Sequence, residues 1–398
     1  MIGRDRADVW LLISLAVVFG IGIATIYSAS TVMEENLFQK QLIWSGFGLA
    51  AFIFGTFISF RRLEEISPLL YGVVCLLLLL TLAIGRGPAD RWIVMGPVHV
   101  QASEIAKAGL IMMMAWWLSS LKVRPRKLGE VLVFLTVLPA IVLTALQPDL
   151  GTAVSMLMIV LAMFVWAGYG FGWIVLLVSP ILAALSSMHI YFWLAFMAVL
   201  SFILYRRKYS IPLWILILGG NSLVAALTPT AWNMLEPYQR SRLVTFLDPA
   251  SDPHGSGWNI IQSEVAVGSG GLTGQGYLQG AQKELAFLPA RHTDFVFSVW
   301  AEETGFIGCL ILLAAFFLLF WRTIRAARKS VNPYNSLVAA GVGAYLAIHV
   351  FVNVGMTLGI MPVTGLPLPL VSYGGSQLII VLFLMGLVTN AGMYWREV

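Results

Sequence analysis

Residues 9–29 read VWLLISLAVVFGIGIATIYSA, an almost wholly apolar run without a charged side chain. A run of about 20 such residues is long enough to cross the hydrocarbon core of a bilayer as an α-helix. It is too long for the core of a signal peptide, and no convincing cleavage site follows it. We therefore interpret it as a retained first span.

The composition extends this interpretation to the whole chain. Of its 398 residues, 59% are hydrophobic and 11% are charged, whereas soluble domains carry roughly 25% charged residues. The 24 basic and 19 acidic residues do not indicate a nucleic-acid partner, because the basic ones form short clusters between apolar runs. Cys75 and Cys309 lie within apolar runs and are interpreted as packing residues. The chain is predicted to be an all-α polytopic membrane protein.

We expect about 10–12 transmembrane helices. The candidate stretches are 9–30, 43–60, 67–84, 103–120, 130–146, 151–168, 172–188, 190–204, 211–228, 295–320, 336–360 and 371–394. Residues 172–204 could instead form one helix kinked at Pro180. Two short helices keep the basic clusters on one side of the membrane, as the positive-inside rule requires. That choice predicts that both termini are cytoplasmic and that residues 229–294 form one large extracytoplasmic loop.

The connections between the spans differ in character. Residues 268–276 (GSGGLTGQG) fit neither a phosphate-binding loop nor a dinucleotide motif, so we expect a flexible or close-packed backbone. Residues 258–267 have the pattern of an interfacial helix. The last outer loop, 361–375, contains three prolines and must pack against protein or line a cavity, because its backbone cannot face lipid.

Asp294 is the first candidate for chemistry. It precedes a predicted span, so it could simply cap that helix. Alternatively, it is an ionised carboxylate at the outer membrane boundary that acts as a general base or a metal ligand. His292 lies two residues away and could share a metal site, although that pair alone is a weak signal.

Glu104 and Lys107 are three residues apart at the start of a predicted span, so they share one helix face. They could be a structural ion pair with Ser103 as the helix cap, or they could face a substrate cavity. Asp149 has the same two interpretations, cap or cavity. His349 lies alone within a span and is interpreted as a packing histidine.

Two further observations limit the possibilities. At most one of Glu302 and Glu303 can face the side of Asp294. Apart from His349, the middle of each predicted span lacks ionisable residues, which coupled carriers commonly need there. The sequence therefore argues against an ion-coupled pump.

Several motifs in this order closely resemble the SEDS family (shape, elongation, division and sporulation), over nearly the whole chain. They are QASEIAK at 101–107, QPDLGT at 147–152, DPASDPHGSGWNIIQS at 248–263, GSGGLTGQG at 268–276, FLPARHTDF at 287–295 and AEETGF at 301–306. Asn353 with GIMP at 359–362, GLPLP at 365–369 and SYGG at 372–375 is similar to the C-terminal signature of the family. The 257–272 region looks more like the elongation member, RodA, than the division member, FtsW.

The resemblance implies a glycosyltransferase that polymerises the peptidoglycan precursor lipid II at the outer face of the bacterial cytoplasmic membrane, with inversion. It implies as partners a class B penicillin-binding protein and the elongation machinery. Asp294 would be the catalytic residue. No organic cofactor is expected, although a divalent cation such as Mg²⁺ or Mn²⁺ could take part. Candidate substrate-binding residues are Glu104, Lys107, Asp149, Arg91, Arg240, Arg242, Arg291, Gln262, Ser263 and Ser372.

The chain departs from the family pattern in places. Ala102, Gln275 and Ala290 stand where Pro, Lys and Glu are common, and about ten spans are usual. The chain is predicted to be a single domain, 1–398, and the extra hydrophobic residues at about 190–228 indicate either an added helical hairpin or fewer spans than the twelve counted here.

Two other functions compete with polymerisation. A lipid II flippase or scramblase would use the Glu104–Lys107 region as its path. A non-catalytic scaffold would recruit the penicillin-binding protein through spans near the C-terminal end, and it would not need a carboxylate at Asp294.

Overall fold

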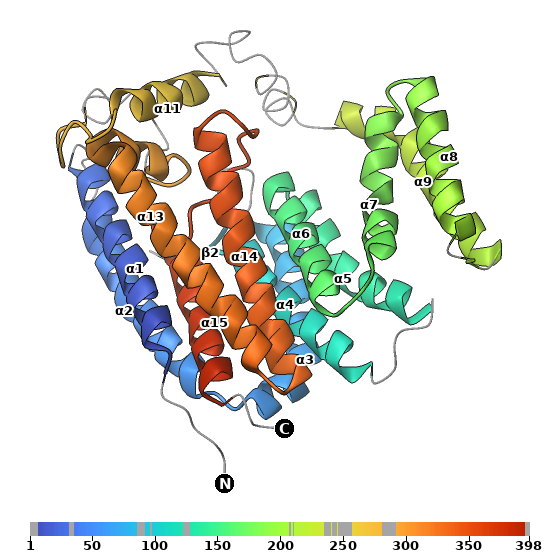
Figure 1. The fold of residues 1–398 in the computed structure, drawn as a ribbon, viewed down its shortest axis with the longest axis horizontal. Coiled ribbons are helices and arrows are strands. Elements are labelled where there is room, and N and C mark those ends of the chain that lie inside the picture. Colours follow the sequence, from blue (N-terminus) through green and yellow to red (C-terminus); the bar gives the residue numbers. More distant parts are fainter. Residues whose placement is uncertain are drawn as a thin grey trace. The chain divides into compact units, whose positions relative to one another are not determined.

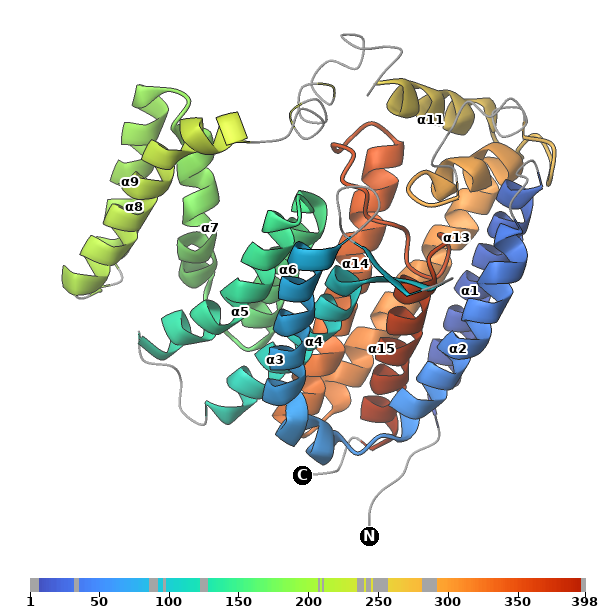
Figure 2. The same ribbon diagram turned by 180° about the vertical axis from the view of Figure 1, so that it is seen from behind.

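The computed structural model describes residues 7–31, 36–85, 92–95, 98–121, 128–206, 208–209, 211–234, 240, 245, 257–280 and 292–394. They are almost wholly helical (Figures 1 and 2). The chain divides into two compact units. The first comprises Met1–Met163 and Val244–Val398, and the second comprises Phe164–Leu243.

The first unit contains the N-terminal and C-terminal helices. Its elements are α1 (Val9–Ser30), α2 (Leu37–Phe57), α3 (Phe60–Ile84), β1 (Trp92–Met95), β2 (Val98–Gln101), α4 (Ala102–Ser120), α5 (Leu128–Leu146), most of α6 (Leu150–Trp166), α11 (Trp258–Ser269), α13 (Val296–Lys329), α14 (Pro333–Thr357) and α15 (Gly375–Met393). The start of α1 and the end of α15 lie at the same end of this unit (Figure 1).

The second unit consists of α7 (Phe171–Ser186), α8 (Ile190–Arg206) and α9 (Ile211–Met234). α7 packs against both of the other helices, and Asn221 donates a 3.0 Å hydrogen bond to Ser179 Oγ. Residues 172–204 thus form two helices, and Pro180 lies within the first of them. This confirms the two-helix interpretation. α8 and α9 cover the region of the predicted hairpin, and their status as an addition to the family pattern stays a prediction.

A helix covers each of the twelve predicted spans. Seven described helices are long and apolar enough to cross a membrane, namely α1, α2, α3, α9 over Ile211–Thr230, α13, α14 and α15. Residues 135–146, 150–166 and 190–206 form shorter apolar helices. The fold is that of an all-α multi-pass membrane protein.

The centre of the first unit is formed by α4, α14 and α15. In the most apolar windows of α14 and α15, 67% and 72% of the residues are buried, against 22% in α2. α4 contacts α3, α5, α14 and α15. A helix that is enclosed by other helices can carry polar side chains at low cost only if they find partners there. This is where the polar residues of the site lie.

α2 and α15 approach each other closely because glycines face each other where they cross. A Cβ atom on Gly386 would lie 2.3 Å from the carbonyl oxygen of Phe52, and one on Gly55 would lie 2.6 Å from that of Phe383. Small residues allow such backbone contact between membrane helices, where van der Waals packing drives association.

α13 is interrupted at Gly305, whose φ of 64° and ψ of −165° are not helical. The glycine-rich segment 271–276 fills the break. Phe306 N–H and Ile307 N–H donate to the carbonyls of Gly271 and Leu272, and Gln275 N–H and Gly276 N–H donate to those of Glu302 and Glu303. The segment is therefore close-packed backbone, which is one of its two predicted states.

Candidate functional site

The site begins where β1 and β2 lead into α4. These strands pair antiparallel, with Trp92 opposite Gln101. Since β2 runs directly into α4, the N-cap position falls on Gln101, without a side-chain cap. The prediction that Ser103 caps this helix is therefore wrong. Ser103 lies one residue inside the helix, and its buried hydroxyl has no hydrogen-bond partner among the described residues.

Glu104 and Lys107 form a buried ion pair in the first turns of α4. Lys107 Nζ lies 2.8 Å from Glu104 Oε1, and the side chains are 0% and 4% exposed. The ammonium group also lies 5.2 Å from the centre of the Tyr345 ring. Burying two charges costs several kcal/mol per ion, and their attraction repays this only with good geometry and additional hydrogen bonds. An ion pair that served stability alone could lie at the surface, where it would avoid this cost.

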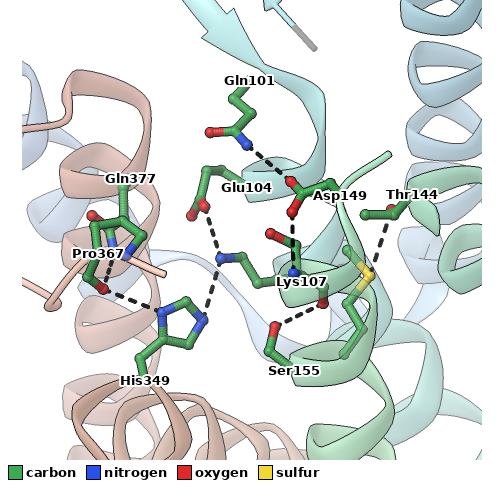
Figure 3. Close-up of polar contacts among 11 residues, drawn as sticks. Gln101, Glu104, Lys107, Thr144, Asp149, Ser155, His349, Pro367 and Gln377 are labelled. Atoms are coloured by element: carbon green, nitrogen blue, oxygen red, sulfur yellow. Dashed lines mark hydrogen bonds and ion pairs between the residues drawn. The ribbon is translucent and has the colours of Figure 1, made fainter. Parts of the chain in front are cut away.

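His349 of α14 completes this cluster (Figure 3). Its Nε2 atom lies 3.3 Å from Lys107 Nζ, and its Nδ1 atom lies 3.4 Å from the carbonyl oxygen of Pro367. An ammonium group can only donate, and a carbonyl can only accept. His349 is therefore neutral, with the proton on Nδ1. It was predicted to be a packing histidine, and its place beside Lys107, 242 residues earlier in the chain, has no signal in the sequence.

Asp149 lies at the start of α6, beside the same cluster (Figure 3). Its Oδ1 atom accepts from Thr152 N–H at 3.2 Å, which is the geometry of a helix cap. Its Oδ2 atom accepts from Gln101 Nε2 at 3.3 Å. The predicted cap is thus present, and the second oxygen connects Asp149 to the hairpin that precedes Glu104.

Asp294 lies in the turn 292–295, which precedes α13, and it is half-buried. Helix α13 begins at Val296 with Phe295 at the N-cap position and no side-chain cap. The interpretation of Asp294 as the cap of this helix is therefore wrong.

The backbone of this turn is held at residues 292–294 by the proline-rich loop 361–375 and by α14. Ser372 Oγ donates to the carbonyl of Thr293 at 2.6 Å, and Tyr373 N–H donates to that of His292 at 2.8 Å. Asn353 of α14 donates to the carbonyl of Asp294 at 2.9 Å. Leu366, Leu368, Leu370 and Val371 of the proline-rich loop are buried, which confirms that this loop packs against protein.

The other predicted site residues lie in different surroundings. Ser263 of α11 is fully buried, and its hydroxyl lies 2.6 Å from Ser298 Oγ and donates to the carbonyl of Thr357 at 2.7 Å. These hydrogen bonds join α11 to the start of α13 and to the end of α14, and Figure 1 shows α11 near both helix ends. Gln262 lies on the same helix, and Arg240 belongs to the second unit. Arg91, Arg242 and Arg291 lie outside the described residues.

The two glutamates after Asp294 are also buried, at 1% and 2% exposure for Glu302 and Glu303. Glu303 accepts a hydrogen bond from Ser28 of α1. Tyr277 donates to the carbonyl of Ala24 in the same helix at 2.9 Å. Partial burial and the nearby Glu303 raise the pKa of Tyr277, so it stays a donor at neutral pH. These contacts tie the break in α13 to α1.

The profile of the FtsW/RodA/SpoVE family, described as a cell cycle protein family, matches residues 8–196 and 192–397. The chain belongs to this family, also called SEDS. It is 36% identical to the peptidoglycan glycosyltransferase MrdB of Escherichia coli K12, over 97% of this chain and 94% of that protein. It is 34% identical to the peptidoglycan glycosyltransferase RodA of Treponema pallidum, over 98% of each.

Solved structures of SEDS proteins share the fold. One chain, from a study of how a peptidoglycan synthase complex coordinates polymerization and crosslinking, matches with a TM-score of 0.72 and 32% identity, over 98% of this chain and 99% of that one. The crystal structure of RodA from Thermus thermophilus matches with a TM-score of 0.65 and 28% identity, over 98% of both chains.

Proposed function

We propose that this protein is a peptidoglycan glycosyltransferase that polymerises lipid II at the outer face of the bacterial cytoplasmic membrane during cell elongation. Curated relatives with this activity that align over nearly the whole chain support the reaction class. The observation that carries the assignment of the site is the Asp294 turn. The turn that carries Asp294 is held by hydrogen bonds to its backbone, one residue before the N-cap position of α13, in the same unit as the buried ion pair of Glu104 and Lys107.

In this proposal Asp294 removes the proton from the attacking sugar hydroxyl, which requires a base within hydrogen-bond reach. The hydroxyl oxygen forms the new glycosidic bond with inversion, and the bond to the lipid pyrophosphate breaks. The leaving group carries negative charge away, so cations near it lower the barrier. Lys107 is the candidate among the described residues of the first unit, and Arg91, Arg240, Arg242 and Arg291 are further candidates.

A divalent cation fits this chemistry. The described residues hold no group of three or more His, Cys, Asp or Glu side chains that could bind a metal. However, Mg²⁺ is commonly held by one or two carboxylates together with substrate phosphates. Asp294 would be the protein ligand in that case, and the cation would supply positive charge for the leaving pyrophosphate.

We also propose that a class B penicillin-binding protein docks its membrane helix on α13 and α14, in line with the peptidoglycan synthase complex named for a structural relative. An apolar groove of about 420 Å³ lies between these helices, lined by side chains such as Phe316, Phe320 and Val350. Phe317 and Phe351 at the groove are 64% and 61% exposed. In the N-terminal half, Phe47 of α2 has a similar exposure, 59%, so Phe351→Ala should reduce co-purification of the partner and Phe47→Ala should not.

The test of the function compares the purified parent with Asp294→Ala on lipid II, with the partner bound and the divalent cation varied. We expect glycan polymer from the parent and a loss of about 100-fold or more in the variant. Polymer from both at equal rates would remove Asp294 from the reaction. No polymer from either would favour the flippase, which a lipid II translocation assay in liposomes then measures directly.

A further inference from the structure

Two polar residues of α14 touch the two parts of the proposed site. His349 contacts Lys107 Nζ, and Asn353 donates to the carbonyl of Asp294. They are four residues apart, so they lie on one face of the helix, about 6 Å apart along its axis. Both are fully buried, at 0% exposure.

The same two residues also hold the proline-rich loop. The Nδ1 atom of His349 lies 3.4 Å from the carbonyl oxygen of Pro367, and Gln377 of α15 donates to that oxygen at 3.1 Å. Asn353 Nδ2 donates to the carbonyl of Leu366 at 2.8 Å. Ser372 and Tyr373, at the other end of this loop, bind the turn that contains Asp294. The loop and the turn are therefore both fixed to one helix face.

We propose that His349 and Asn353 are positioning residues, which set the place of the Asp294 carboxylate relative to the ammonium group of Lys107. The inference rests on the proposed function, in which the first group takes a proton and the second faces the leaving group. Both groups must meet one substrate, and a displacement of about 1 Å can cost on the order of 100-fold in rate. A helix, unlike a loop, keeps two contacts at a constant separation.

The chain offers a matched control for Asn353. Asn390 of α15 is also buried, at 2% exposure, and its amide nitrogen likewise donates to two carbonyls, those of Gly55 at 3.3 Å and Ile58 at 2.7 Å. It ties α15 to the end of α2, and none of its hydrogen bonds involves the Asp294 turn. Asn353→Ala and Asn390→Ala therefore remove the same kind of interaction from different places.

His349 has a conservative replacement. The side-chain amide of glutamine both accepts and donates, so His349→Gln can keep the contacts with Lys107 and Pro367. His349→Leu keeps the volume approximately but removes both contacts. A role in packing alone would make the leucine variant the better tolerated of the two.

The experiment measures kcat and KM for lipid II polymerisation, together with the unfolding temperature, for these four variants and Asp294→Asn in the presence of the partner. We expect Asn353→Ala to lower kcat about 10-fold or more, while Asn390→Ala, with a similar loss of stability, keeps kcat within about twofold of the parent. His349→Gln should retain most of the activity that His349→Leu loses.

Two outcomes separate this inference from the proposed function. If Asp294→Asn is inactive but Asn353→Ala and Asn390→Ala have equal kcat values, the positioning role is wrong and the function stands. If Asp294→Asn is as active as the parent, Asp294 is not the base and this inference falls with that role, whereas absence of polymer from the parent itself would contradict the proposed function. Equal activity of His349→Gln and His349→Leu would also overturn the role of His349.

Discussion

The two ends of the first unit use the same structural devices in different surroundings. At one end, Glu104 and Lys107 form an ion pair that is at most 4% exposed. At the other, Asp8 at the start of α1 pairs with Arg322 near the end of α13, at 25% and 15% exposure. Each end also has a buried asparagine that joins two carbonyls.

The two ion pairs differ in whether both carboxylate oxygens have hydrogen-bond partners. Asp8 caps α1 with one oxygen and binds Arg322 with the other, so both of its oxygens are used for structure. Glu104 Oε2 is buried and has no hydrogen-bond partner among the described residues. Buried polar atoms without partners are costly. We infer that the contacts of Asp8 serve the packing of the helices, whereas the Glu104–Lys107 pair leaves one carboxylate oxygen for a further partner such as the substrate.

The largest effect is expected at the buried pair. Lys107→Met leaves Glu104 charged and uncompensated, which should lower the free energy of unfolding by about 3–5 kcal/mol. The double variant Glu104→Gln/Lys107→Met should recover most of that loss, because neither residue is then charged. Neither variant should polymerise lipid II. Thermal unfolding in detergent measures the first claim, and a parent-like midpoint for Lys107→Met would contradict the burial of the pair.

A smaller effect is expected at the opposite end. Asp8→Asn keeps an oxygen for the cap of α1 but removes the charge that binds Arg322, so it should cost about 1.5 kcal/mol. Polymerisation per folded molecule should not change. An activity loss larger than the loss of folded protein would show that this end, too, takes part in the reaction.

The smallest effect is expected at an exposed pair. Arg61 Nε lies 3.5 Å from Glu65 Oε1 one turn later in α3, and the side chains are 90% and 64% exposed. Water screens this attraction, so Glu65→Gln should change stability by less than about 0.5 kcal/mol. Its unfolding midpoint, measured beside those of Lys107→Met and Asp8→Asn, completes a series in which the loss of stability increases with the burial of the ion pair.

The sequence predicts the helices of this protein well because each is an apolar run of sufficient length, a local property. It also predicts that Glu104 and Lys107 share a face, since they lie within one helical turn of each other. Contacts between distant segments have no such local signal. The contacts of Lys107 with His349 and of Asn353 with Asp294 depend on how α4, α13 and α14 pack.

Two errors have a common physical cause. Ser103 and Asp294 are both good capping types near a helix start, but the cap position is set by where the preceding chain enters the helix. The β-hairpin places it at Gln101, and the turn before α13 places it at Phe295. The break at Gly305 was not predicted either, because hydrogen bonds from residues 271–276 stabilise it.

We propose that Asp294 acts in the reaction, whereas Asp149, the carboxylate that caps α6, chiefly supports structure. The most direct test compares initial rates of lipid II polymerisation for Asp294→Asn and Asp149→Asn, with the partner bound. Asparagine cannot serve as a base, so we expect a loss of about 100-fold or more for Asp294→Asn. At position 149, asparagine can still accept the hydrogen bond that caps α6. Asp149→Asn should lose less than about 10-fold. Equal rates for the two variants, or a parent-like rate for Asp294→Asn, would contradict this claim.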